Sequence, residues 1–391
     1  MGTILIIAFF QMSQQTLSPA IDTIAKLFPE QGLKGVQEAF AIISIVASIV
    51  GILSAVLINN GLMTKRGAMI GGLFVLGATG PVAALLHTEF WHLQLLGVMI
   101  GTAMGLYIVN TGSVLFDSFT NEERQPIVGY QTSCISGGGI FWSLAGGVLC
   151  SVIWYGGYLM LTLALPLAFL AWRTVPKTPR VVRAKNSGER VKMNPMIYYY
   201  CAILGIFMGL YVVGGSNIST HLAQAGSTQS ALAGAVAAVQ MAGGAVCGIF
   251  FGRLSKKLGD LIIVAAMLAL IIGFVLLGLF PNSLVITFIA MFISGMSLSC
   301  TAPRVMFAVS SLSNERTSAT SSAIANSVAP SLGSFLSPYI FTRTTLNLFG
   351  EATSARYLFV AGVAAVFGII IAVLTLNRRR RGFTDMGEKI A

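Results

Sequence analysis

The sequence contains few charged residues. Only 9% of its 391 residues are Asp, Glu, Lys or Arg, whereas 55% are hydrophobic. A soluble surface needs roughly a quarter to a third charged residues, so this composition excludes a soluble protein of the same length. Together with a mean hydropathy of +0.82, it predicts an all-α protein whose helices span a lipid bilayer.

Histidine and cysteine are also scarce, which limits the chemistry available at membrane depth. His87 and His92 lie near Glu89 between two apolar segments, where interfacial polar residues are a simpler interpretation than a metal site. The five cysteines fall inside apolar segments without metal-type spacing. We therefore predict no metal, no cofactor and no catalytic site, and hence no enzyme.

Basic residues are concentrated in the middle of the chain. Short loops rich in Lys and Arg stay on the cytoplasmic side of a membrane, so topology and anionic headgroups, rather than nucleic acid, account for the net charge of +11. The predicted domains are an N-terminal six-helix bundle over 1–172, a cytoplasmic basic linker over 173–195, a C-terminal six-helix bundle over 196–377 and a cytoplasmic tail over 378–391. The linker cations are Arg173, Lys177, Arg180, Arg183, Lys185, Arg190 and Lys192, against Glu189.

Each half contains six long apolar segments. Twelve spanning helices place both termini on the cytoplasmic side, together with the linker. The compact loops are typical of a bacterial inner-membrane protein. Of the 24 Lys and Arg residues, the predicted outer segments contain only Lys26, Lys34, Arg343 and Arg356. The second-half helices are expected at about 196–220, 229–252, 259–280, 283–303, 318–342 and 356–376, and the first-half helices begin with one at about 2–24.

The two halves repeat each other. Three landmarks recur at nearly one offset, which indicates a duplicated six-helix unit. A polar turn follows the fourth and the tenth helix, a glycine lies inside each of these helices, and a short turn follows the second and the eighth. The matched positions are 121–124 with 314–316 at an offset of 193, Gly101 with Gly295 at 194, and 59–60 with 256–257 at 197.

The turn after the eighth helix carries a family signature. Gly252 to Gly259 follows the frame glycine, three residues, acid, arginine, one residue, glycine, with Lys256 and Lys257 in the acid and arginine positions. With this frame and the duplicated six-helix pattern, the whole chain resembles the major facilitator superfamily (MFS). The resemblance implies two pseudo-symmetric six-helix bundles around a solute site near the membrane midplane.

The fifth helix is similar to the antiporter signature of drug exporters within that superfamily. Gly129, Gly138, Gly146 and Gly147 fit its spacing, but 142–143 reads Trp-Ser where the signature has Gly-Pro. The arginine usual in proton-coupled exporters, four residues before Gly101, is replaced by glycine. A drug/proton antiporter type of multidrug efflux pump is therefore kept as an alternative.

Polar residues well inside the helices are the candidates for the solute site. Neutral amides and phenols offer hydrogen bonds without the desolvation penalty of a charge. Arg304 is the exception, and its guanidinium either binds a carboxylate or phosphate on the solute or snorkels to the inner surface. The candidates are Gln11, Gln14, Gln15, Tyr107, Asn110, Gln131, Tyr211, Asn217, Gln240, Arg304 and Asn326. The first three, at spacings typical of one α-helical face, are expected to share that face.

Charged residues at the inner helix ends are candidates for a cytoplasmic gate, in which ion pairs seal one side and break when that side opens. The alternative is that they are solvated loop charges that contribute little. The candidates are Asp117, Glu122, Arg124, Lys256, Lys257, Glu315 and Arg316.

These features predict a secondary active transporter of a small organic solute, with an organic anion among the candidates. It would work by alternating access, driven by a proton or solute gradient because the chain lacks a Walker-type loop. A transport-inactive membrane sensor on the same fold is the alternative from another class. The expected partners are the solute, the lipid bilayer and, as a candidate coupling ion, the proton. The protein is expected to be a monomer and to bind no nucleic acid.

Overall fold

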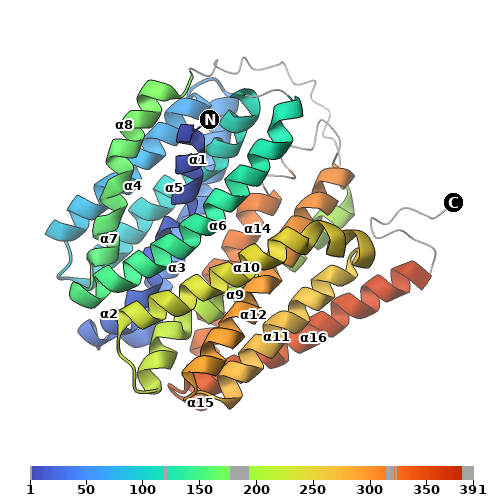
Figure 1. The fold of residues 1–391 in the computed structure, drawn as a ribbon. Helices are drawn as coiled ribbons and strands as arrows, with labels where there is room; N and C mark the ends of the chain where they lie inside the picture. Colours follow the sequence, from blue (N-terminus) through green and yellow to red (C-terminus); the bar gives the residue numbers. More distant parts are fainter. Residues whose placement is uncertain (1, 119–120, 177–192, 314–320, 322–323, 381–391) are drawn as a thin grey trace. The chain divides into compact units, whose positions relative to one another are not determined.

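The computed structural model describes residues 2–118, 121–176, 193–313, 321 and 324–380. Within these ranges the chain is almost entirely helical and has no strand (Figure 1). Eleven helical segments among the described residues are long and apolar enough to cross a membrane, and some of them consist of several short helices in succession. The chain divides into two compact units, Met1–Glu189 with Thr228–Ala238, and Arg190–Ser227 with Val239–Ala391. Most of the predicted linker, 177–192, lies outside the described residues, so the linker stays a prediction.

The first predicted span, 2–24, is not one continuous α-helix. An α-helix occupies each end of this span, and 3₁₀ turns form its middle. Pro19 has no N–H for the carbonyl of Gln15, and its ring clashes with that carbonyl in an α-helix, so the chain tightens before it. The elements are α1 Gly2–Phe9, η1 Phe10–Thr16, η2 Ser18–Ala20 and α2 Ile21–Leu27.

Close backbone contacts hold the remaining helices of the N-terminal unit. A Cβ atom at Gly101 would lie 2.6 Å from the carbonyl oxygen of Ile43, so glycine allows α5 to cross α3 at short range. Likewise, Gly138 brings α6 against the backbone of Phe9. These helices are α3 Gly32–Asn59, α4 Lys65–Leu85, α5 Phe90–Ser118, α6 Asn121–Val152, α7 Gly156–Met160, η3 Leu161–Leu163 and α8 Ala164–Thr174.

The C-terminal unit has the same character. In Figure 1, α11 and α16 lie side by side, and they are in contact along their length. The eleventh predicted span, 318–342, is described only in part and is broken by two π-helical stretches, the second of which begins at Pro338. The helices that lie wholly or mostly in this unit are α9 Pro195–Gln224, α10 Ser230–Leu258, α11 Leu261–Leu279, α12 Leu284–Leu312, η4 Ile324–Val328, α14 Ala329–Ser337, η5 Pro338–Thr342, α15 Arg343–Phe349 and α16 Thr353–Arg380. Residues 230–238 of α10 belong to the N-terminal unit.

Several predicted helices are too short, because the helices of the structure extend into polar sequence. The signature segment predicted as a turn is mostly the end of α10, and the chain reverses only at Gly259, whose φ of +58° suits a glycine. The predicted polar turn at 121–124 is the first turn of α6. Similarly, α9 and α16 extend beyond the predicted spans of 196–220 and 356–376, so His221 lies inside α9 and Arg356 lies about one turn inside α16 rather than at its end. Both residues make hydrogen bonds to side chains of another helix, a feature that hydropathy does not register.

Candidate functional site

The three glutamines of the first span do not share one face. Gln11 is buried, whereas Gln14 and Gln15 are half-buried, and all three lie in η1. A 3₁₀-helix has three residues per turn, so Gln11 and Gln14 stack while Gln15 turns away by about 120°. The prediction of a single polar stripe is therefore wrong for Gln15, because it assumed α-helical geometry.

Two backbone carbonyls at the start of the 3₁₀ stretch accept hydrogen bonds from buried side chains. The phenol O–H of Tyr107 donates to the carbonyl of Phe10 at 2.8 Å, and the indole N–H of Trp142 donates to Phe9 at 2.8 Å. Both side chains are buried. Tyr107, a predicted cavity residue, thus has its proton committed to the backbone. Trp142 is the first residue of the Trp-Ser pair that stands in place of Gly-Pro in the antiporter signature, and its indole proton is committed to the carbonyl of Phe9.

Asn110 and Gln131 complete the predicted site residues of the N-terminal unit. Asn110 is buried, and its amide N–H donates to the carbonyl of Leu106 at 2.7 Å and to the hydroxyl of Ser54 at 3.4 Å. Gln131 is half-buried in α6. Asn110 therefore bonds mainly with its own helix, and Gln131 keeps part of its surface open.

In the C-terminal unit, the predicted residues have contrasting surroundings. The ring of Tyr211 is buried and stacks on Phe207, with centroids 5.9 Å apart. Gln240 is buried, and its amide lies 3.5 Å from the hydroxyl of Ser294. Asn217 is fully buried, and Asn326 is exposed in the π-helical η4. The predicted residues are thus spread over buried and open positions.

Arg304 is held in a buried ion pair. Its Nε donates to Oδ1 of Asp260 at 2.9 Å, and the phenol of Tyr200 donates to Oδ2 of the same carboxylate at 2.6 Å. The arginine, the acid and the tyrosine come from α12, the residue before α11, and α9, and all are at least nine-tenths buried. The snorkelling interpretation is wrong, since a snorkelling guanidinium would be exposed. Sequence reasoning missed Asp260, although it directly follows the signature glycine Gly259.

A second buried arginine was not foreseen. The sequence places Arg356 in an outer segment, yet it is fully buried in the first turns of α16. Its guanidinium donates to Oδ1 of Asn217 and, at 3.0 Å, to the hydroxyl of Thr345. His221, also missed, is buried nearby on α9. The sequence feature that could have indicated this histidine is Asn217, a predicted site residue that lies one helical turn before it.

The predicted gate is described only in part. Lys256 and Lys257 are exposed in the last turn of α10, where cations interact favourably with the helix dipole. The side chains of the other predicted gate residues lie outside the described part of the structure, so the gate stays a prediction. These are Asp117, Glu122, Arg124, Glu315 and Arg316.

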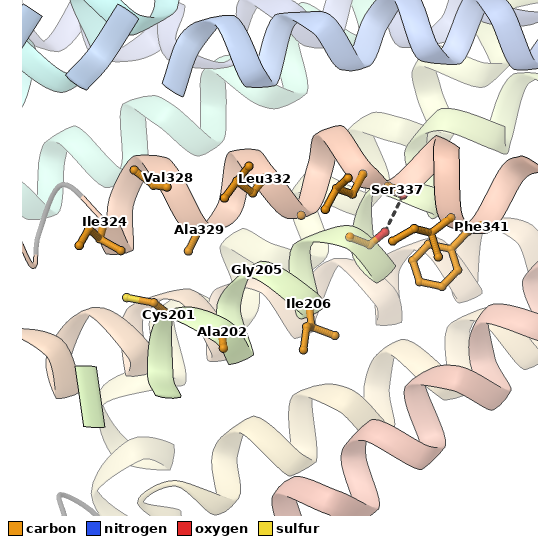
Figure 2. A pocket seen from close by; sticks show the side chains of 14 residues that line it. Cys201, Ala202, Gly205, Ile206, Ile324, Val328, Ala329, Leu332, Ser337 and Phe341 are labelled. Carbon is orange, nitrogen blue, oxygen red and sulfur yellow. Dashed lines mark hydrogen bonds between the residues drawn. The ribbon is translucent and has the colours of Figure 1, made fainter. Parts of the chain in front are cut away.

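A groove of about 360 Å³ lies between α9 and the broken helix formed by η4, α14 and η5 (Figure 2). Its lining is almost wholly apolar, and the hydroxyl of Ser337 donates across it to the carbonyl of Gly209 at 2.6 Å. Gly205 and Gly333 allow the two helices to touch backbone to backbone. None of the predicted polar site residues lines this groove, which suits an apolar occupant.

Comparison with known proteins identifies the fold. The family model described as Major Facilitator Superfamily matches residues 3–338. Among curated proteins, none matches the sequence. A POT family transporter, PepTSo, has a TM-score of 0.75 and 11% identity over 97% of this chain and 98% of its own.

Two other solved structures are similar. A mutant of the nucleoside transporter NupG has a TM-score of 0.73 at 12% identity, over 95% of this chain and 98% of its own. A bacterial homologue of the human lysosomal transporter Spinster has a TM-score of 0.68 at 15% identity, over 99% and 98% of the two chains. Such identities show the fold alone. The family match extends over most of the chain and confirms the expected fold: this protein belongs to the major facilitator superfamily and is a multi-pass membrane transporter.

Proposed function

We propose that the protein is a secondary transporter that carries a small polar organic solute by alternating access, driven by a gradient of protons or of a second solute. The observation that carries the proposal is the presence of buried or half-buried neutral amides inside helices long enough to span a membrane, among them Gln11, Gln14 and Gln240. Polar groups at that depth face a bundle interior or a cavity rather than lipid. The similar structures include transporters named for nucleosides and peptides, which are small polar solutes.

The predicted site residues fall into two groups in this proposal. Gln11, Gln14, Gln131, Gln240 and Asn326 make the solute contacts, and the 3.5 Å bond between Gln240 and Ser294 is long enough for a solute to replace it. Tyr107, Asn110 and Arg304 position the helices through hydrogen bonds of 2.7–2.9 Å to protein groups. A solute carboxylate at Arg304 would have to displace Asp260. The geometry at that site therefore favours a solute that carries no net negative charge there.

One observation favours a second candidate function. The groove between α9 and α14 is apolar and has a volume of about 360 Å³, a size within the range of small-molecule sites. A lipophilic compound would fit it better than a polar one. Multidrug efflux is therefore the alternative, and its substrate would be stabilised by contacts such as Leu332 and Ile340.

The test is a thermal-shift panel on purified protein followed by uptake into proteoliposomes. The panel contains nucleosides, short peptides, organic anions and lipophilic cations. A polar solute that raises the unfolding midpoint should bind about 3- to 10-fold more weakly to Gln240→Ala, which loses a hydrogen bond worth about 0.5–1.5 kcal/mol. The exposed Gln229→Ala is the matched control.

Uptake then tests the coupling. The same solute should accumulate when a pH or solute gradient is imposed, and accumulation should stop when the gradient is collapsed. Stabilisation by lipophilic compounds alone, unchanged in Gln240→Ala and weakened by Leu332→Ala, would replace this proposal with multidrug efflux.

A further inference from the structure

Residues of α9 and α16 form a buried polar cluster in the C-terminal unit. Asn217 and His221 lie four residues apart on α9, and Thr353 and Arg356 lie three residues apart in the first turns of α16. Such spacings place each pair on one helical face. Arg356 donates to Asn217, and Nδ1 of His221 lies 3.0 Å from Oγ1 of Thr353. Two hydrogen bonds therefore join the two helical faces.

The hydrogen bonds of this cluster fix the direction of each donor. The amide N–H₂ of Gln224 donates to the carbonyl of Glu351 at 2.7 Å, so its oxygen faces Thr353 and accepts from that residue's backbone N–H at 3.0 Å and its hydroxyl at 2.7 Å. A hydroxyl has one proton. Nδ1 of His221 must therefore donate to Thr353, which leaves Nε2 of the neutral ring as an acceptor.

Residues in this part of α9 and α16 carry buried polar atoms without partners. Among the described residues, six buried side-chain nitrogen or oxygen atoms have no hydrogen-bond partner, and three of them are Nη2 of Arg356, Nε2 of His221 and Oγ1 of Thr220. Buried polar groups are ordinarily satisfied, and each exception needs an explanation such as a bound ion or water. Two of these three atoms can donate a hydrogen bond, namely the guanidinium nitrogen and the threonine hydroxyl.

The charge of Arg356 is also unbalanced. Its two hydrogen-bond acceptors, Asn217 and Thr345, are neutral. The carboxylate of Glu351 is close enough to influence it, but this residue is exposed, and within the described structure the two make no ion pair. The N-terminal end of α16 adds about half a positive charge, and the C-terminal end of α9 supplies about half a negative one. A fully buried guanidinium in these surroundings lacks a counter-ion.

We propose that Arg356 is the centre of a binding site for a compact monovalent anion, which pairs with Nη2 of the guanidinium and accepts a second hydrogen bond from the hydroxyl of Thr220. Asn217 and Thr345 position the guanidinium by holding its other edges. Water would satisfy the hydrogen bonds, but only an anion also balances the charge. The anion is either a free halide or the carboxylate of a transported solute, and the second source rests on the proposed transport function.

The first test measures the unfolding midpoint of the purified full-length protein in sodium chloride, sodium acetate or sodium gluconate at equal ionic strength. Gluconate is the bulky reference that an enclosed site excludes. Chloride, acetate or both should raise the midpoint saturably above that in gluconate. The rise should disappear in Arg356→Gln and persist in Arg343→Gln, which removes an exposed arginine near the start of α15.

A second measurement locates the anion without a variant. Crystals of the wild-type protein grown in bromide should show an anomalous peak within hydrogen-bond distance of Nη2 of Arg356. A chloride response with that peak assigns a free halide, and an acetate response without a chloride response assigns a carboxylate. Equal midpoints in all three salts, with no bromide peak, would overturn the proposal. So would a saturable rise that survives in Arg356→Gln. A failure of solute uptake leaves these binding results unchanged, so the two proposals fail separately.

Discussion

Asn110 in the N-terminal unit and Arg304 in the C-terminal unit occupy matching positions of the repeat, 194 residues apart, yet their surroundings differ. The amide of Asn110 bonds to the carbonyl of Leu106 in its own helix. The guanidinium of Arg304 instead joins its helix to Asp260 in a buried ion pair. At the offset of 197 that relates the two short turns, Met63 stands opposite Asp260. The first half therefore lacks both charges.

One glycine position of the repeat is the same in both halves. Gly101 allows α5 to cross α3 at short range, and Gly295 allows α12 to approach α10 at the backbone of Gln240. At this position the repeat thus shares close helix packing, and the buried ion pair of Arg304 and Asp260 lies in the second half. Because separating a buried ion pair leaves an unpaired buried charge, we infer that the C-terminal unit has fewer alternative helix arrangements of similar energy.

The largest effect is expected from breaking the ion pair on the acid side. Asp260→Asn removes the carboxylate that pairs with the buried guanidinium of Arg304, which should lower the free energy of unfolding by about 3–5 kcal/mol. Chemical denaturation in detergent measures this change. The matched control is Asp22→Asn, whose partner Lys26 is 59% exposed, and a pair exposed on one side should contribute no more than about 1 kcal/mol.

A double variant separates the pair's net contribution from the penalty of an unpaired charge. Asp260→Leu combined with Arg304→Met removes both charges and should recover most of the lost stability. If the double variant is as unstable as Asp260→Asn, the loss comes from packing at these positions, and the contrast with Asn110 is not electrostatic.

The phenol of Tyr200 sharpens the same comparison. Tyr200→Phe removes the donor to Oδ2 of Asp260 but keeps the ring, and hydrogen bonds to charged groups contribute about 1.5–3 kcal/mol. We expect a loss of stability in this range, measured by the same denaturation experiment. Tyr198→Phe, at a 54% exposed position of the same helix, should have no effect. A neutral result for Tyr200→Phe would show that the carboxylate finds another donor.

The matching glycines test whether packing is truly shared. Gly295→Ala and Gly101→Ala should each lower stability by about 1–3 kcal/mol, because the added Cβ meets backbone in both units. The loss at Gly295 should be the larger of the two, since its Cβ would overlap the carbonyl of Gln240 whereas that of Gly101 lies 2.6 Å from Ile43. Gly362→Ala, with no atom within 4 Å of the new Cβ, should stabilise α16 by about 0.5–1 kcal/mol. Equal stability in all three variants would contradict the role given to these glycines.

Hydropathy predicted the spanning helices well, because the apolar runs are long and the composition is extreme. It failed where polar side chains satisfy one another across helices. Arg356 follows a polar stretch, so its position in the sequence predicts an outer residue. In the structure it is buried and donates a hydrogen bond to Asn217, 139 positions earlier. The sequence around Asp260 predicts an exposed turn. In the structure its carboxylate is buried and accepts hydrogen bonds from Tyr200 and Arg304. Such pairings depend on tertiary contacts, which no local pattern in a single sequence records.

The smallest effect should come from the N-terminal counterpart of Arg304. Asn110→Leu keeps the approximate volume and removes an amide whose main acceptor, the carbonyl of Leu106, lies one turn back in the same helix. Ser54, its other partner, already donates to the carbonyl of Gly51 at 2.9 Å. No buried charge is left behind, so the free energy of unfolding should fall by no more than about 1.5 kcal/mol. A loss as large as that of Asp260→Asn would mean that the stability of both halves depends equally on this position. The two halves would then differ in the chemistry of the side chain at this position, and not in how strongly that side chain holds the helices together.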